Sequence, residues 1–341
     1  MCNKLFAVLL VLGFVAGAGA VDFGDLYLHY TFDAADDIGG MVTNGSVIPG
    51  DPPTWKDAGV LGELAMGQVV SNSSDGYQYT PSLIGEGMVL TNDGPIPPAD
   101  PAVVNNEMAD TVDIETTTET DPLWRPFEDK TISIWFRQDL PINPDNHCGQ
   151  WTSDLNYIFA TYGPKTRMMI MLLPNETDPF VGPDKLVFRA GGKSFAGVQY
   201  NTPDLGNIEI TLGEWHHAVL TLTNIDGPEG SNCLARAYLD GVMVGVGKTI
   251  RASDQYKSSA YWDYPVGANI GAYQFDENTN YEAADGITVD DFAVYQGGRP
   301  GQDIAGIYAE GLQGIAAHDI PEPATIALLG LGALALLRKR S

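Results

Sequence analysis

Short apolar or alternating segments recur along the second half of this chain and limit it to one fold class. Each segment is too short for an ordinary helix and is bounded by Gly, Pro, Asn or Asp, which favour turns. Only 303–312 has a helical pattern. Many short strands with one helix predict an all-β protein, an antiparallel β-sandwich. The expected strands lie at 131–137, 157–162, 168–173, 185–190, 215–223, 234–239, 242–246, 268–274 and 287–295.

The first half of the chain is less regular. Residues 27–32 alternate and predict a first strand, whereas 38–83 is rich in Gly, Pro, Ser, Asn and Asp and predicts weak strands at most. The segments 92–101 and 111–122 have too few apolar residues for a core and are expected to be surface loops. We therefore expect one domain over 21–315, with loop insertions at about 38–126.

Seven pieces of the sequence, taken in order, resemble the strands of a known family. The pieces are YTFD at 30–33, GEGMVL at 85–90, FEDKTISIWF at 127–136, GEWHHAV at 213–219, AYLDG at 237–241, IGA at 270–272 and GITVDDFAVY at 286–295. They are similar to the laminin-G-like jelly roll of the concanavalin A-like lectin/glucanase superfamily, over roughly residues 25 to 313. The resemblance implies a jelly-roll sandwich and a role in binding glycan or protein.

The same superfamily includes glucanases, so a catalytic pair of carboxylates is the first activity to consider. Retaining glycosidases need two carboxyl groups about 5 Å apart, and strand alternation brings residues i and i+2 to one face. The family's Glu-x-Asp-x-x-Glu run is absent from this chain. Asp113 and Glu115 lie in a segment expected to be a loop, and Glu209 has no second carboxyl at 211. These observations favour a non-catalytic domain.

The adjacent histidines His216 and His217 follow Trp215 in an expected strand. Alternation places the two rings on opposite faces, so they cannot bind one metal ion together. We expect one ring to pack in the sandwich and the other to lie at the surface. Elsewhere, no Cys/His spacing is typical of zinc.

Acidic residues dominate the charge of the chain. It has 44 acidic and 18 basic side chains, and 43 and 14 of these lie in 21–320, a net charge of −29. Such a surface repels nucleic acid and favours cations, calcium especially, although solubility in a salty exterior explains the charge equally well. The resemblance implies a structural calcium, with Asp33, Asp290 and Asp291 as candidate ligands. The alternative for these residues is solvation at turns and strand edges.

Aromatic residues crowd one segment near residue 260. Aromatic faces stack on sugar rings while nearby polar groups fix the hydroxyls. The segment is therefore a candidate glycan site, and packing in the core is the alternative for its aromatic residues. The candidate residues are Tyr256, Tyr261, Trp262, Asp263 and Tyr264.

The N-terminus has the pattern of a secretory signal peptide over 1–20. Lys4 is followed by an apolar run at 5–15 and by a small-residue cleavage site at 18–20. Export makes a disulfide between Cys148 and Cys233 plausible, with two thiols as the alternative. Cys2 is expected to leave with the signal peptide.

Three elements in a fixed order close the sequence over 321–341. The motif Pro321, Glu322 and Pro323 precedes an uncharged apolar run at 324–337. A helix of this run would be about 21 Å long, short of the ~30 Å bilayer core. Basic side chains can snorkel to the interface, so the segment is expected to stop in a membrane. The basic residues that follow the run are Arg338, Lys339 and Arg340.

This tail resembles the PEP-CTERM sorting signal of bacteria that make extracellular polysaccharide, which a membrane exosortase recognises and processes. Together the features predict an exported, exosortase-sorted surface or extracellular-matrix protein, transiently anchored in the membrane. Its jelly roll is expected to bind extracellular polysaccharide or a surface protein. One alternative is a polysaccharide-active hydrolase or lyase whose carboxylates meet only in three dimensions. Another is a purely structural matrix protein.

Overall fold

The structure is a computed structural model. It describes residues 26–32, 54–55, 65–70, 78–90, 111–116, 129–141, 156–161, 166–173, 184–192, 205–225, 232–250, 267–276, 279–283 and 286–314. The signal peptide, the aromatic segment at 256–264 and the tail at 321–341 lie outside these ranges.

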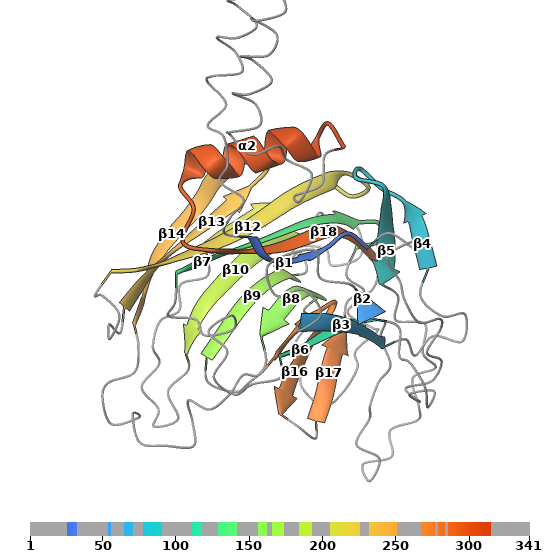
Figure 1. The fold of residues 1–341 in the computed structure, drawn as a ribbon, viewed down its shortest axis with the longest axis horizontal. Coiled ribbons are helices and arrows are strands. Elements are labelled where there is room, and N and C mark those ends of the chain that lie inside the picture. Colours follow the sequence, from blue (N-terminus) through green and yellow to red (C-terminus); the bar gives the residue numbers. More distant parts are fainter. Residues whose placement is uncertain are drawn as a thin grey trace, which may run out of the picture.

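Two antiparallel sheets and one helix make up most of the described chain (Figure 1). Sheet A has the strand order β14-β13-β12-β7-β18-β5-β4, with β1 also paired to β18. Its strands are β1 (Leu26–Tyr30), β4 (Gln78–Pro81), β5 (Glu86–Leu90), β7 (Lys130–Gln138), β12 (Trp215–Asn224), β13 (Asn232–Leu239), β14 (Val242–Ile250) and β18 (Ile287–Gln296).

Sheet B has the order β11-β10-β9-β8-β15-β6-β3-β2, and β16 and β17 form a separate ribbon. The predicted all-β antiparallel sandwich is confirmed. The strands of sheet B are β2 (Thr54–Trp55), β3 (Ala65–Val70), β6 (Thr111–Thr116), β8 (Asn156–Thr161), β9 (Thr166–Leu173), β10 (Lys185–Gly192), β11 (Leu205–Glu209) and β15 (Gly267–Ile270). The ribbon consists of β16 (Ala272–Asp276) and β17 (Thr279–Ala283).

The main core is formed by residues from both sheets. In β7, Ile132, Ile134 and Phe136 are fully buried in it, as strand alternation requires. Phe292 of β18 stacks on Phe159 of β8, with ring centroids 5.4 Å apart, and so joins the two sheets directly. Burial of this apolar surface is the main force that stabilises the sandwich.

The other face of sheet A is covered by helix α2 (Gly301–Gly311), which lies across the sheet in Figure 1. Ile304 packs on Val219 and Tyr238, and Ile307 joins a cluster with Tyr295. The helix was expected at 303–312 and is confirmed within two residues at its start and one at its end. This cover makes the second face of sheet A a second buried layer.

Two predictions about local structure are wrong. The expected loop 111–122 begins with strand β6, because Thr, Val and Ile favour extended backbone and β3 and β15 pair with it on both sides. The expected single strand 268–274 is two strands in different sheets, because Gly271, with φ +86°, turns the chain between β15 and β16. The short strands β11 and β17 were also not predicted.

The end of α2 provides a test of how closely the helix packs on sheet A. A Cβ added to Gly311 would lie 2.5 Å from the Trp135 ring, whereas one added to Gly301 would meet Tyr238 at an ordinary 3.4 Å. We expect Gly311→Ala to lower the free energy of unfolding by about 1–3 kcal/mol through overpacking, measured by urea denaturation. Gly301→Ala is the matched control within the same helix. Equal stability of the two variants would contradict this packing.

Candidate functional site

Polar residues on the helix-covered face of sheet A form a buried cluster that includes residues singled out from the sequence. In β7, Ser133 and Trp135 alternate with core residues and therefore face α2. His217 of the neighbouring strand β12 pairs with Trp135 in register. Ser133, Trp135 and His217 are all at most 1% exposed.

A β-bulge in β18 places two carboxylates in the same layer. The register of β18 with β7 shifts between Asp290 and Ala293, and Asp291 has the left-handed φ of +42°. An extra residue at a bulge re-aims its side chain, which lets adjacent residues contact the same side of a sheet. Asp290 and Asp291 are both buried.

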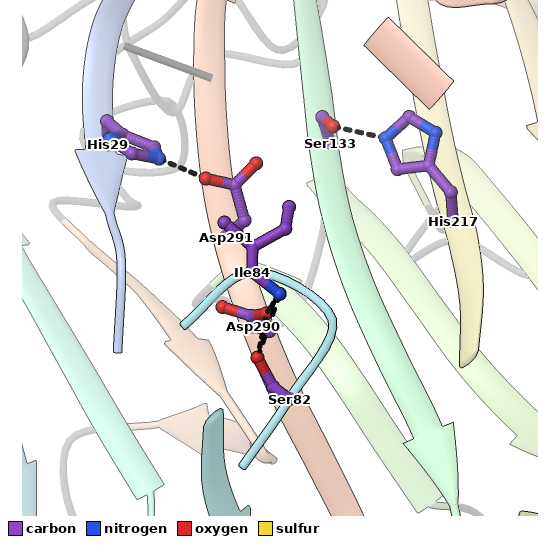
Figure 2. A network of polar contacts seen from close by, with 7 residues as sticks. All are labelled: His29, Ser82, Ile84, Ser133, His217, Asp290 and Asp291. Carbon is purple, nitrogen blue, oxygen red and sulfur yellow. Dashed lines mark hydrogen bonds and ion pairs between the residues drawn. The ribbon is translucent and has the colours of Figure 1, made fainter. Parts of the chain in front are cut away.

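The two carboxylates contact different parts of the chain (Figure 2). Asp291 Oδ1 pairs with Nε2 of the buried His29 in β1. Asp290 Oδ2 accepts hydrogen bonds from Ser82 Oγ at 2.5 Å and from the Ile84 backbone N–H at 3.2 Å. Asp291 therefore fixes β1, and Asp290 fixes the turn between β4 and β5.

Burial changes the protonation of this layer. Desolvation raises the pKa of Asp290 to about 8; the Ser82 hydrogen bond opposes this rise, and the Asp291 charge adds to it. Asp290 is therefore mostly protonated at neutral pH. Desolvation also lowers the pKa of His217 to about 4, so its ring is neutral.

His217 contacts a serine and two aromatic rings. Its Nε2 lies 2.7 Å from Ser133 Oγ (Figure 2), and its ring stacks on Trp135 at 4.8 Å between centroids. Tyr308 of α2 stacks on Trp135 at 5.5 Å. The helix thereby closes this part of the layer.

A serine hydrogen-bonded to histidine is also the start of a nucleophilic catalytic site. Here Ser133 is only 1% exposed, and His217 Nδ1 has no hydrogen-bond partner among the described residues. A catalytic histidine needs an orienting group on that nitrogen, and a substrate must reach the serine. The geometry therefore fits a structural role for this pair.

The histidine prediction needs one correction. His216 and His217 do face opposite sides of β12, but neither lies at the surface. His216 is 8% exposed, and its Nδ1 lies 2.9 Å from Asp240 Oδ2. The interaction with Asp240 raises the pKa of His216 even though desolvation, the largest single influence, lowers it. The expected surface position of one ring was wrong, because His217 lies on the outer face of sheet A and α2 covers that face.

The candidate calcium ligands do not form a metal site by themselves. The described part of the chain has no group of three His, Cys, Asp or Glu residues placed to hold a metal ion. Asp290 and Asp291 contact protein groups, Ser82 and His29 respectively. Asp33 lies outside the described ranges, so a site that includes Asp33 stays a prediction.

The remaining predicted sites lie wholly or partly outside the described ranges. Cys233 is buried in β13, while Cys148 lies outside the described ranges, so their disulfide stays a prediction. The aromatic candidates at 256–264 and the tail lie outside them as well. Within the ranges described, no helix is long and apolar enough to cross a membrane.

Sequence reasoning did not connect His29, Ser82 and Ser133 with the Asp pair. His29 stands between apolar residues of an alternating strand, and Ser133 stands between two isoleucines. A polar residue that alternates with apolar ones is equally typical of a solvent-exposed sheet face. The local sequence therefore contains no signal for the buried layer beneath α2.

Comparison with known proteins identifies the tail. Residues 319–341 match the model of the PEP-CTERM protein-sorting motif. No curated protein sequence matches the chain.

Solved structures with low sequence identity also match this fold. One is domain 4 of AbnA, an extracellular GH43 arabinanase from Geobacillus stearothermophilus, in complex with arabinotriose: 15% identity, TM-score 0.44, covering 82% of this chain and 97% of that one. Another comes from work on botulinum neurotoxin type C, whose cell entry depends on two ganglioside molecules: 13% identity, TM-score 0.47, covering 85% and 52%. The binding domain of botulinum neurotoxin DC with rat synaptotagmin II has 11% identity, TM-score 0.48 and coverage of 85% and 52%. This chain thus spans about half the length of the two neurotoxin chains.

The buried Asp290 carboxyl predicts a pH dependence of stability. The folded pKa of about 8 lies above the ordinary 3.8, so the folded state keeps a proton that the unfolded state releases. This contribution to stability is present below pH 4 and is lost as the pH rises to about 8. Asp290→Asn keeps an acceptor for Ser82 and Ile84 but removes the ionisation.

We therefore expect the stability of Asp290→Asn to fall less than that of the unsubstituted chain between pH 5 and pH 9. Urea denaturation at several pH values measures the difference, and Glu209→Gln, which changes an exposed carboxylate on β11, is the control. Coinciding pH profiles for the unsubstituted chain and Asp290→Asn would show that Asp290 is not protonated in the folded state.

Proposed function

We propose that this chain is an exported, exosortase-sorted surface protein whose sandwich is a non-catalytic module that binds extracellular glycan or a protein. The carrying observation is the PEP-CTERM motif at 319–341, which marks the chain for export and for sorting to the cell surface. Processing by an exosortase follows from the same motif. The short apolar run at 324–337 serves as a transient membrane anchor in this proposal.

The buried polar cluster supports a binding module over an enzyme. Ser133, His217 and the Asp pair all hold structural elements together beneath α2. Recognition of a partner must then use the surface of the sandwich and its loops. The aromatic segment at 256–264, with Asp263, remains our candidate glycan site. Calcium, bound through Asp33, is proposed only as a structural cofactor.

One observation keeps a hydrolase as the second candidate. Asp113 and Glu115 lie two residues apart in β6, a strand of sheet B, and not in a loop. Residues at this spacing on a strand share a face. A retaining glycosidase requires two carboxyl groups close together, so this pair is the one to substitute in an activity assay.

Deletion of 321–341 tests the sorting proposal. We expect the truncated protein to leave the cell envelope and accumulate in the medium, measured by fractionation and immunoblotting. Replacing Pro321, Glu322 and Pro323 by Ala keeps the apolar run and so separates loss of the motif from loss of the anchor. Identical distribution of the truncated and full-length chains would show that the tail is not a sorting signal.

A glycan array with the exported protein tests the binding module. We expect selective binding that Trp262→Ala weakens by about five- to thirtyfold, since loss of one stacking ring costs on the order of 1–2 kcal/mol. Parallel arrays with calcium and with chelator test the metal. A reducing-sugar assay with Asp113→Asn as control tests hydrolysis. If the protein hydrolyses a glycan and Asp113→Asn abolishes this activity, the hydrolase replaces the binding module as the proposed function. If the protein binds no glycan on the array, a protein becomes the proposed partner.

A further inference from the structure

Exposed apolar side chains gather at one end of sheet A, which we name the exit end. There β7 ends at Gln138, β12 begins at Trp215 and β18 begins at Ile287, in mutual register. The hairpin that joins β13 to β14 turns at the same end. Five of the seven exposed large apolar residues of the described chain lie here: Leu140, Leu212, Val242, Met243 and Leu312.

Helix α2 ends near the exit end, over Trp135, which lies three residues before the end of β7. Tyr308 stacks on Trp135, and Gly311 packs against the same ring. A Cβ on Gly314 would lie 3.4 Å from the Leu83 carbonyl oxygen, so the turn after the helix contacts the β4–β5 turn. Leu83, Trp215 and Tyr308 are half-buried around Trp135 and extend the apolar surface. Leu312, 51% exposed, is the C-cap residue of α2.

The tail leaves the fold at this point. Ten residues, 315–324, lead from Gly314 to the first residue of the apolar run. Fully extended, they reach at most about 36 Å. A domain of about 300 residues has a radius of gyration near 19 Å and hence a diameter of about 50 Å. With the run in a bilayer, the tether excludes the orientation in which the opposite end of sheet A rests on the membrane and the exit end points straight outward.

The charges around the exit end indicate which kind of lipid this surface could contact. Asp139, Glu214 and Asp240 lie beside the apolar residues. The one described arginine among them, Arg137, is paired with Asp139 at 2.7 Å. This local surface, like the whole domain, repels anionic headgroups. Apolar side chains with a half-buried Trp and Tyr suit the interfacial region of a neutral bilayer, where aromatic residues are enriched.

We propose that the exit end is a membrane-contact surface, which rests on zwitterionic phospholipid while the tail is anchored. This inference rests on the proposed anchoring by 324–337. The tether gives the patch a high effective concentration at the bilayer, so individually weak apolar contacts suffice. The contact would orient the sandwich with its opposite end toward the exterior.

Site-specific cross-linking in vesicles tests this contact. The full-length exported protein, with p-benzoyl-phenylalanine at position 312 or 243, is reconstituted into phosphatidylcholine vesicles, purified by flotation and irradiated. The matched control position is 225, because Ile225 is also exposed and apolar but follows β12 at the opposite end. Mass spectrometry measures lipid adducts at each position.

We expect a several-fold excess of lipid adducts at 312 and 243 over 225. Val242→Glu should lower the yield at 312, whereas Ile225→Glu should leave it unchanged. Flotation with equal yields at all positions would overturn the membrane contact and leave the anchoring intact. Failure of the full-length chain to float would overturn both the anchoring and the contact, and the fractionation experiment would still decide whether the motif sorts the protein.

Discussion

Two carboxyl groups on one β-bulge lie where water does not reach them, and the middle of sheet A is arranged around that constraint. A buried carboxyl is costly unless it is protonated or supplied with donors. Asp291 receives His29 from the first strand, and Asp290 receives the Ser82 hydroxyl and the Ile84 N–H from the β4–β5 turn. Elements far apart in the sequence are therefore joined at one position of β18. Truncating either carboxyl group would remove one of these links between β18 and the rest of sheet A.

Helix α2 makes this arrangement possible because it excludes solvent from the outer face of the sheet. Without the helix, His217 and Ser133 would face water, and the pKa of His217 would not be lowered by burial. The helix contacts the sheet mainly through Ile304, Ile307 and Tyr308, each placed over a different cluster. The protein thus has two buried layers, one apolar between the sheets and one mixed beneath the helix. The mixed layer holds the residues that look catalytic in isolation.

Strands with strong alternation or apolar runs could be predicted from the sequence, for example TISIWF in β7 and WHHAVLTLT in β12. Their periodicity is local, so it can be read without knowledge of their partners. Strand β6 was missed although its Thr, Val and Ile favour extended backbone, because the Thr-rich, acidic sequence around it is typical of a surface loop. Its pairing with β3 and β15 is not visible in the local sequence. The same limit applies to the Asp pair, since the donors to Asp290 come from residues more than 200 positions away. Ser133 and His217 are buried because the 11-residue helix α2 lies over them. The position of this helix on the sheet cannot be predicted from the local sequence.

The pairing of the first described strand with the last has a consequence for biogenesis. Residues of β1 pair with Phe292, Ala293, Val294 and Tyr295. Strand β1 can therefore pair only after almost the entire domain has been synthesised and exported. In the proposed export through a membrane pore, β1 emerges well before β18, and β18 emerges shortly before the tail. Contacts this distant in sequence form slowly, because closing so long a loop has a high entropic cost. Strand β1 can pair with β18 only when the sorting motif, which follows β18 closely in the sequence, also reaches the membrane. The last steps of folding and the first steps of sorting are therefore expected to occur at the same time and place.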